Sequence, residues 1–377
     1  MTLLEADTPL SLSKSDVQAA VPPHLFEIST ARSLRYAATS VALTVVPVVL
    51  ALRYLPLSWA WLPIWLLYAV VVGTFACGAW VIAHECGHGA FSKNKLVQDT
   101  VGFVLHSALL VPYFSWQRSH AVHHAKTNHL SDGETHVPLR DDAASGKRAL
   151  ARRSKLGRNA FALYNISVHL LLGWPIYLLT GATPADGPAR TNHFWPFKPF
   201  SKRLFPARFT RRVLGSAVGV LTVIALLTWW AAATSPWLVL AVYGGPYLVN
   251  NAWLVGYTWL HHTGVDTPHY EADDWSFVRG AFCSIDRPYG RLIDTLHHRI
   301  GSTHVAHHLF SRLPHYHAAE ATAAIREAFP QSYRYDPTPI PVALWRVGTD
   351  CVATTKTETG WCYIAEANPT ASDDRAN

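Results

Sequence analysis

Four long apolar runs constrain the fold of this chain more than any other feature of its sequence. A bilayer core about 30 Å thick is crossed by about 20 helical residues. Residues 61–83 meet this length easily, and residues 37–52 meet it only marginally. Residues 213–233 and 237–259 form a second pair, and a short proline-containing link separates the runs within each pair. The sequence therefore predicts two helical hairpins that cross a membrane.

The low charge content supports this prediction. Only 15% of the 377 residues are formally charged, whereas an ordinary soluble domain carries about 25%. Two further apolar stretches, residues 97–116 and 161–180, contain polar residues and are interpreted as re-entrant or interfacial segments. We therefore predict an all-α integral membrane protein with about four transmembrane helices and a cytosolic helical cap. Its predicted parts are a cytosolic or interfacial N-terminal segment (1–36), one membrane domain (37–365) and a disordered tail (366–377).

The distribution of the net charge of +7 indicates a membrane orientation rather than nucleic-acid binding. Fourteen of the 32 Lys and Arg residues lie between Arg140 and Arg212, in a segment that joins hydrophobic runs. Cytoplasmic loops of membrane proteins carry such an excess of basic residues. The polar regions 84–212 and 260–377 are therefore predicted to face the cytosol.

Histidine is the most unusual residue type in this chain, and eight of the 21 histidines fall into three short clusters. Residues three and four apart share one face of a helix, so each cluster would direct two or three imidazoles the same way. The spacing His-x-x-His-His occurs twice, and all three clusters lie on the predicted cytosolic side. The clusters are His84 and His88; His120, His123 and His124; and His304, His307 and His308.

The number of imidazoles discriminates between kinds of metal site. The segment from His84 to His88 alone is the His-Glu-x-x-His helix of zinc proteases, yet one tetrahedral zinc takes only four ligands. Eight imidazoles fit two metal ions, and imidazole binds iron, copper, nickel or zinc, so the ligand type leaves the metal open. A carboxylate-rich di-iron site would need Glu-x-x-His on two helices, and Glu85-x-x-His88 is the single example in the sequence. The clusters therefore predict a histidine-rich site for two metals.

Five segments in and around the clusters carry a family resemblance: "HECGHGAFS", "LHSALLVPYFSWQRSHAVHH", "DDWSFVRGAFCSIDR", "THVAHHLFSRLPHYHAAEAT" and "YDPTPIPVALWRV". They resemble the membrane fatty acid desaturase and hydroxylase superfamily, in particular its Δ12 (oleate) desaturases, over roughly residues 15–365. The resemblance implies two iron ions held by nine histidines, the eight of the clusters and His262. It has departures, since Gly89 stands where many Δ12 enzymes have His or Gln, and "HHTG" and "LHHRIG" are closer to ω3 desaturases.

The resemblance also implies residues that support the ligands or enclose the substrate. Glu85, His261 and His298 are predicted to orient metal ligands without binding metal. A narrow apolar tunnel is predicted beside the metals, with Cys77, Trp80 and Trp253 as candidate lining residues and interhelical packing as their alternative role. Four further carboxylates would either orient ligands or lie on a solvated surface: Asp132, Glu134, Asp273 and Asp274. Three further histidines are expected to have structural roles: His106, His315 and His317.

The activity implied by the resemblance is O2-dependent insertion of a cis double bond into a membrane-associated acyl chain, most closely Δ12 desaturation of oleate to linoleate. An unactivated methylene C–H bond offers no acidic proton, so this chemistry needs a metal that activates O2. An ω3 desaturase, a fatty acyl hydroxylase and an acetylenase are alternatives on the same scaffold, and a membrane zinc protease is a distant one. The acyl carrier is a phospholipid or coenzyme A.

The expected partners follow from the same reasoning. The sequence contains no His-Pro-Gly-Gly haem motif of a fused cytochrome b5. An external electron donor of the cytochrome b5 or ferredoxin type is therefore expected as a partner. Membrane lipid is a second expected partner, and nucleic acid is not expected to bind. The active site is expected on the cytosolic face of the endoplasmic reticulum in a eukaryote, or of the plasma membrane in a bacterium.

Overall fold

The computed structural model describes residues 8–181 and 190–363, and it confirms the predicted all-α membrane fold. Strands within these residues form one antiparallel hairpin of β1 (Thr354–Thr357) and β2 (Gly360–Tyr363). The predicted tail, residues 366–377, lies outside the described residues. The α-helices are α1 (Lys14–Ala19), α2 (Thr30–Tyr54), α3 (Leu62–His88), α4 (Lys95–Ala108), α5 (Tyr113–Ala125), α6 (Ala144–Leu156), α7 (Arg158–Thr180), α8 (Thr210–Ala233), α9 (Pro236–Val239), α10 (Gly245–His262), α11 (Phe277–Phe282), α12 (Arg291–Leu296), α13 (His304–Leu309), α14 (His315–Ala328) and α15 (Ile340–Asp350). The shorter turns are η1 (Pro23–Phe26), η2 (Trp59–Trp61), η3 (Ala207–Phe209), the π-helical η4 (Leu240–Gly244) and η5 (Ala272–Asp274).

Five described segments are long and apolar enough to cross a membrane, one more than predicted. The additional segment is α7, which contains the stretch predicted as re-entrant or interfacial at residues 161–180. His169 does not interrupt α7, because its Nδ1 bonds the Asn165 carbonyl oxygen (2.9 Å) and its ring stacks on Trp259. Pro175 also lies inside the continuous helix. The five segments are Thr30–Tyr54, Trp59–His88, Arg158–Thr180, Ala207–Ala233 and Pro236–His262.

The first span begins earlier than predicted and is therefore not marginal in length. α2 starts at Thr30 and has 25 residues, because the Ser29 side chain caps it by accepting a hydrogen bond from the Arg32 N–H. The polar residues 30–36 thus extend the helix beyond the apolar run. The predicted boundary at residue 36 falls inside α2, and only α1 and η1 precede this helix among the described residues.

The stretch predicted as re-entrant at residues 97–116 is a bent pair of helices. α4 and α5 form an angle of 102°, and Leu110 in the break between them has φ 57. Gly102 permits the sharp return, because a Cβ at this position would lie 2.4 Å from Cε2 of Tyr113. The bend directs α5 back toward the end of α3, so that the first two histidine clusters approach each other.

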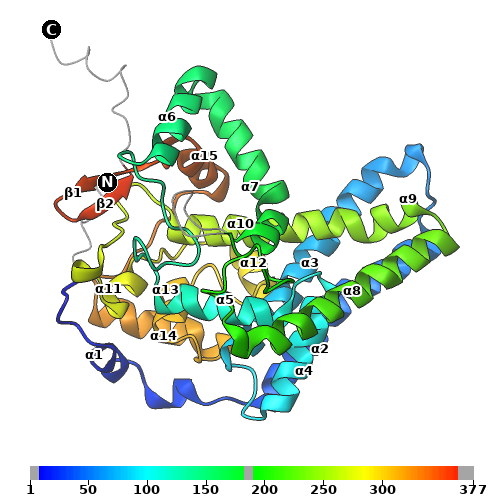
Figure 1. Ribbon diagram of the computed structural model, residues 1–377. Helices are drawn as coiled ribbons and strands as arrows, with labels where there is room; N and C mark the ends of the chain where they lie inside the picture. Colours follow the sequence, from blue (N-terminus) through cyan, green and yellow to red (C-terminus); the bar gives the residue numbers. More distant parts are fainter. Residues whose placement is uncertain (1–7, 182–189, 364–377) are drawn as a thin grey trace, which may run out of the picture.

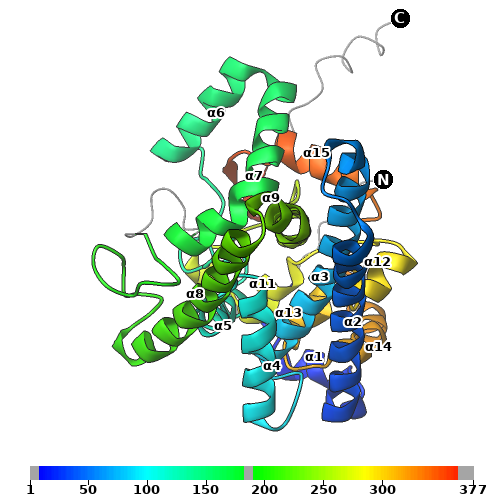
Figure 2. The same ribbon diagram turned by 90° about the vertical axis from the view of Figure 1, so that its right-hand side faces the viewer.

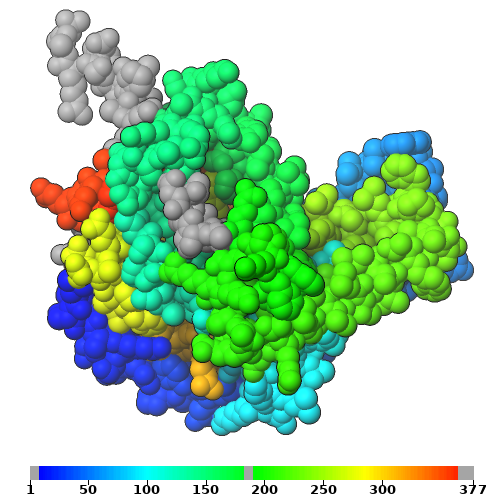
Figure 3. Space-filling view, viewed as in Figure 1, coloured from blue at the N-terminus to red at the C-terminus, as the bar shows by residue number. Residues whose placement is uncertain are grey.

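The long helices and the helical cap meet where the clusters lie. α3 packs against both α2 and α10, and α7 packs against α10 and α15. In Figure 1, α2, α3, α8 and the α9–α10 segment extend from one side of a body that contains α5 and α11–α14, and in Figure 2 this side faces the viewer. The same extension stands out from the surface in Figure 3. α3 and α10 end inside the body, at His88 and His262, so the histidines lie at this junction.

Candidate metal centre

The first cluster lies on the last turn of α3. The helix ends directly after His88, because Gly89 has φ +81, the left-handed conformation that favours glycine at a helix end. Gly87 makes room for the second cluster, since a Cβ at this position would lie 2.6 Å from Cζ3 of Trp116 on α5. The local sequence therefore both stops α3 and lets α5 pack against its end.

Imidazoles one helical turn apart converge in every cluster. Residues i and i+4 lie above one another on one face of a helix, and here their rings turn toward the same point. Each such pair has its Nε2 atoms 3.1 Å apart: His84 with His88, His120 with His124, and His304 with His308.

His262 joins the clusters from a fourth helix. It is the last residue of α10, and its side chain is almost completely buried. Its Nε2 lies 3.1 Å from Nε2 of His123 and 3.1 Å from Nε2 of His304. The structure thus brings all nine predicted ligands together.

The nine histidines divide into two groups. In each group the nitrogen atoms that could bind metal lie within 4.8 Å of one another. His304 lies outside these limits but adjoins the smaller group, because its Nε2 is 3.1 Å from those of His262 and His308. The first group is His84, His88, His120, His124 and His307, and the second group is His123, His262 and His308 with the adjoining His304.

The spacing and the burial of these nitrogens fit metal ligands. Imidazole nitrogens bind zinc at about 2.0–2.1 Å, which places neighbouring ligands about 2.8–3.4 Å apart in octahedral or tetrahedral geometry. The observed separations of 3.1 Å lie within this interval. Nε2 of His307 is buried and has no hydrogen-bond partner in the described part of the chain. Because a buried polar atom without a partner is destabilising, two metal ions would satisfy lone pairs that the protein leaves facing one another.

Burial also keeps the imidazoles in the form that binds metal. Desolvation lowers the pKa of His304, His307 and His308 well below the ordinary histidine value, and neighbouring imidazoles lower it further. A metal binds the unprotonated ring nitrogen, so a neutral cluster is ready for ligation without losing protons.

The third cluster depends on a carboxylate from outside its helix. α13 has no side-chain cap at Thr303. Instead, one oxygen of buried Asp286 accepts a hydrogen bond from the Val305 N–H (2.8 Å), and the other accepts one from the Tyr333 hydroxyl (2.7 Å). Asp286 therefore fixes the start of the helix that carries His304 and His308.

Glu85, His261 and His298 lie beside the two groups in different ways. Glu85 is buried, with Oε1 3.4 Å from Nδ1 of His84 and Oε2 accepting a hydrogen bond from the His315 N–H at 3.0 Å. His261 uses both ring nitrogens elsewhere, since Nδ1 donates to a backbone carbonyl and Nε2 lies 3.2 Å from a tyrosine hydroxyl. His298 is farther away, with its Nε2 3.0 Å from Oγ of Ser40.

The remaining carboxylate candidates differ in their burial and in their partners. Glu134 is buried and accepts a hydrogen bond from the Tyr177 hydroxyl at 2.9 Å. Asp132 pairs with Arg203 across 2.6 Å in a half-exposed ion pair, so it has the surface role that was its alternative. Asp273 and Asp274 are exposed in η5 and make no described contact with either histidine group.

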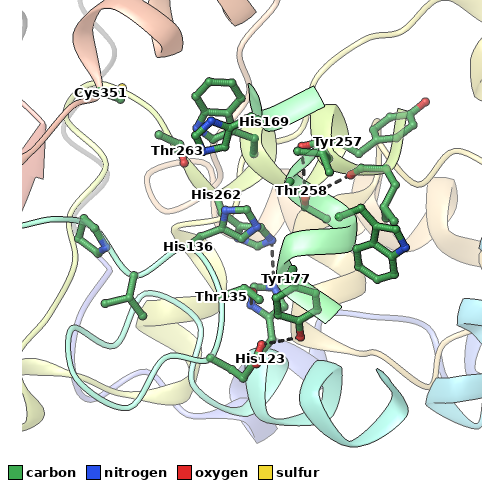
Figure 4. Close-up of a pocket in the computed structure, with 18 of the residues that line it drawn as sticks. His123, Thr135, His136, His169, Tyr177, Tyr257, Thr258, His262, Thr263 and Cys351 are labelled. Carbon is green, nitrogen blue, oxygen red and sulfur yellow. Dashed lines mark hydrogen bonds between the residues drawn. The ribbon is translucent and has the colours of Figure 1, made fainter. Parts of the chain in front are cut away.

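A cavity of about 480 Å³ adjoins the histidines, a volume typical of small-molecule sites. Its wall includes His84, His120, His123, His262 and His304. Figure 4 shows His123 and His262 beside this cavity, with Tyr177 and Thr258 on its wall. The rest of the wall is largely apolar and aromatic, with Trp80, Trp116, Trp174, Leu254, Val255 and Tyr257 among its residues.

Two of the three predicted tunnel residues line the cavity. Cys77 and Trp80, both on α3, lie on its wall. Trp253 on α10 lies outside it, because its indole N–H donates to Oγ1 of Thr74 at 2.9 Å and its ring packs on Tyr257. Trp253 therefore has the interhelical packing role that was its alternative.

Residues 127–136 contribute contacts that the sequence did not indicate. Thr127 and Thr135 place hydroxyl groups 2.9 and 2.7 Å from ring nitrogens of His308 and His123. His136 lines the cavity and stacks on His262 with ring centroids 5.2 Å apart. This segment is not helical, so no periodicity could have identified these residues.

The fold and the site together define a class of protein: a helical membrane protein with two groups of converging histidines beside an apolar cavity. The sequence model of the family described as fatty acid desaturase matches residues 28–339. This chain therefore belongs to the fatty acid desaturase family. The predicted family and the predicted enzyme class, an oxidoreductase, are confirmed, and the protease alternative has no support.

Curated relatives match most of the chain. A Δ12 fatty-acid desaturase of Vernicia fordii is 39% identical over 342 residues, which cover 89% of this chain and 86% of that protein. A Δ12 fatty-acid desaturase of Arabidopsis thaliana is 40% identical over 347 residues, 90% of this chain and 87% of that protein. An oleoyl-12-hydroxylase of Ricinus communis is 38% identical over 343 residues, 89% and 85% of the two chains.

Proposed function

We propose that this protein inserts a cis double bond at the Δ12 position of an oleoyl chain held in the cavity. The observation that carries the proposal is the convergence of nine imidazoles, five of which lie on the wall of one apolar cavity. The names of the two Δ12 desaturase relatives support the Δ12 position. Sequence identity alone does not distinguish a desaturase from a hydroxylase, because the oleoyl-12-hydroxylase of Ricinus communis is 38% identical to this chain over a similar length.

The two histidine groups are the proposed ligands of two iron ions. When bound and reduced, the irons would supply the O2 activation that removal of hydrogen from an unactivated methylene requires. The burial of the ligands keeps them unprotonated, and the Nε2 atoms that face one another define where each metal would lie. Glu85 would orient His84 in the first group, and His261 and His298 would support neighbouring structure without binding metal.

The cavity wall would position the acyl chain and keep water away from it. Trp80 and Trp174 present large aromatic faces to the cavity, and Leu254 and Val255 present branched side chains. Such a wall excludes water from the reacting carbons and restricts the acyl chain to few conformations. The position of the double bond would then depend on which methylenes this wall places beside the histidines.

The orientation in the membrane and the electron donor complete the proposal. The excess of Lys and Arg between Arg140 and Arg212 supports a cytosolic position for the histidine groups. The donor would be a separate protein of the cytochrome b5 or ferredoxin type that reaches the site from the cytosol. In a eukaryotic cell the membrane would be the endoplasmic reticulum, and in a bacterium it would be the plasma membrane.

The test is expression in a yeast that lacks polyunsaturated lipids, followed by gas chromatography of its fatty acids. Linoleate is the expected product. A hydroxylated acid or an ω3 product alone would refute the Δ12 assignment. His304→Ala should abolish the product, whereas His24→Ala, which changes an exposed histidine paired with Glu320, should leave it intact. Full activity in the His304 variant would refute the assignment of the metal ligands.

A further inference from the structure

The two histidine groups differ in the residues that hold them from outside. Thr135 Oγ1 lies 2.7 Å from Nδ1 of His123, and Thr127 Oγ1 lies 2.9 Å from Nδ1 of His308. Both histidines belong to the second group. A hydrogen bond at one ring nitrogen sets which tautomer the imidazole adopts and how the ring is oriented for metal binding.

The hydrogen bonds of Thr127 determine the tautomer of His308. The Thr127 hydroxyl donates its proton to the backbone carbonyl oxygen of His123 at 2.9 Å. Its oxygen is therefore left as the acceptor for the proton on Nδ1 of His308. With this proton on Nδ1, the lone pair of His308 lies on Nε2, the atom that faces His304 across 3.1 Å. Thr127 thus fixes His308 in the form that binds metal through Nε2.

His136 supports a third imidazole of the second group by packing rather than by hydrogen bonding. Nδ1 of His262 is buried and has no hydrogen-bond partner among the described residues. The ring of His136 covers one face of His262, with centroids 5.2 Å apart and planes 23° apart. Figure 4 shows the two rings side by side. His136 has φ 57, an uncommon conformation for a residue other than glycine, and the surrounding structure must hold it there.

The same segment is anchored to the protein by its backbone. The Leu130 N–H donates to the Tyr270 carbonyl oxygen at 2.8 Å, and the Tyr270 N–H donates to the Asn128 carbonyl oxygen at 2.9 Å. The Trp275 indole donates to the Thr127 carbonyl oxygen at 2.9 Å. Residues 127–130 are buried as a result. These bonds therefore hold residues 127–130, including Thr127, in place.

The first group does not share this support. Within residues 8–181 and 190–363, the side-chain hydrogen bonds and ring contacts of Thr127, Thr135 and His136 reach imidazoles of the second group alone. The first group instead has a carboxylate beside it, because Oε1 of Glu85 lies 3.4 Å from Nδ1 of His84. One group is thus oriented by neutral hydroxyls and an aromatic face, and the other by a negative charge.

We infer that residues 127–136 act as a clamp that sets the metal affinity of the second histidine group and leaves the first group unaffected. Thr127, Thr135 and His136 are positioning residues in this scheme, since each acts through an imidazole. The inference rests on the proposed function, because it presupposes that both groups bind metal. It predicts that damage to the clamp yields a protein with one metal position weakened, rather than an unfolded or metal-free protein.

The test is the metal content of the intact, iron-loaded enzyme in detergent after equilibration with increasing chelator. Thr135→Val is the decisive variant, because the Thr135 hydroxyl bonds only His123 among the described residues and valine preserves the shape of the side chain. One of the two irons should be lost at a chelator concentration about 10- to 100-fold lower than in the wild type, the range that outer ligand partners control. The other iron should be retained as in the wild type. Thr135→Ser, which keeps the hydroxyl, should restore the wild-type curve.

Two control variants separate the clamp from general stability. Thr222→Val removes a hydroxyl that, in the described part of the chain, bonds only a carbonyl within α8, and it should leave both metals in place. His136→Phe keeps an aromatic face on His262 and should retain the second-group metal more tightly than His136→Ala, with the first-group metal held equally by both. If Thr135→Val does not fold, the two His136 variants decide the question by the same titration.

The possible results distinguish this inference from the proposed function. If wild-type enzyme binds no more than one metal, the proposed function fails. If it binds two metals and the Thr135 and His136 variants lose both together, or lose neither at lower chelator concentration, the clamp is refuted and the proposed function stands.

Discussion

Gly87→Ala tests whether the absence of one side chain determines the distance between the first two histidine clusters. A Cβ at position 87 would lie 2.6 Å from Cζ3 of Trp116, and ordinary contacts begin at 3.4 Å. Trp116 or α3 would therefore have to move by about 0.8 Å. Trp116 is 3% exposed, and its ring stacks on His120 with centroids 4.5 Å apart. A shift of Trp116 would thus displace an imidazole of the first group.

Two opposing contributions determine how Gly87→Ala changes the free energy of unfolding. Alanine is favoured over glycine inside a helix by about 1 kcal/mol, whereas overpacking a well-filled core costs about 1–3 kcal/mol. Gly256→Ala is the matched control, because a Cβ at this helical position meets only Leu170 at 3.8 Å. Both substitutions gain the same helix propensity, so the free energy of unfolding of Gly87→Ala should be about 1–3 kcal/mol lower than that of Gly256→Ala.

The assay is denaturant unfolding in detergent together with iron content, measured in a double-mutant cycle. Trp116→Leu removes the indole carbons that an alanine at position 87 would meet. In this background Gly87→Ala should lose its overpacking penalty, which gives a coupling energy of about 1–3 kcal/mol between the two positions. The reasoning is refuted if Gly87→Ala is as stable as Gly256→Ala and retains its full iron content.

Two further predictions concern buried carboxyl groups. Asp286→Ala removes the acceptor of the Val305 N–H and of the Tyr333 hydroxyl, and each buried donor left without a partner costs about 1–3 kcal/mol. Asp286→Asn keeps one acceptor, so it should unfold at a temperature between those of the wild type and the alanine variant; equal effects of the two substitutions would contradict the capping role. Burial raises the pKa of Glu134 to about 8 from 4.5, so the folded protein holds this proton at pH values where the unfolded chain has released it. The stability of the metal-free wild type relative to Glu134→Gln, which keeps an acceptor for the Tyr177 hydroxyl, should therefore fall as pH rises from 4.5 to 8, by up to about 1.4 kcal/mol per pH unit. The buried histidines are the same in both proteins, so their own pH dependence cancels in this difference. A difference that does not change with pH would show that Glu134 is ionised in the folded protein.

The sequence predicted the parts of the site that depend on a single helix. His120 and His124 are one turn apart on α5, and helical geometry alone brings their Nε2 atoms within 3.1 Å. The pairing of His123 with His262 could not be derived in this way, because it depends on how α5 and α10 cross after folding. Only the family resemblance indicated His262.

The residues that the sequence missed or misplaced lie where regular periodicity is interrupted. His136 follows a non-helical segment and has φ 57, so no face of a helix or strand predicts where its ring points. Trp253 lies on α10, which follows the π-helical η4. A π-turn shifts the helical phase of everything after it, so the face of Trp253 cannot be inferred from the apolar run that contains it. His169 and Pro175 lie within the continuous helix α7, because its structure accommodates these polar and helix-breaking residues locally.

The position of Glu85 explains why His-Glu-x-x-His has a different meaning here from its meaning in a zinc protease. Successive residues of an α-helix point about 100° apart, so Glu85 cannot face the same way as His84 and His88. His84 lines the large cavity, whereas Glu85 borders a separate small pocket with His298, His307 and His315. Its carboxylate already accepts the His315 N–H, so it ties α3 to α14. A general base must reach the reacting molecule, and Glu85 lies on the other side of the ligands from the cavity. The motif therefore specifies two imidazoles on one helical face, and the surrounding fold determines what the glutamate between them does.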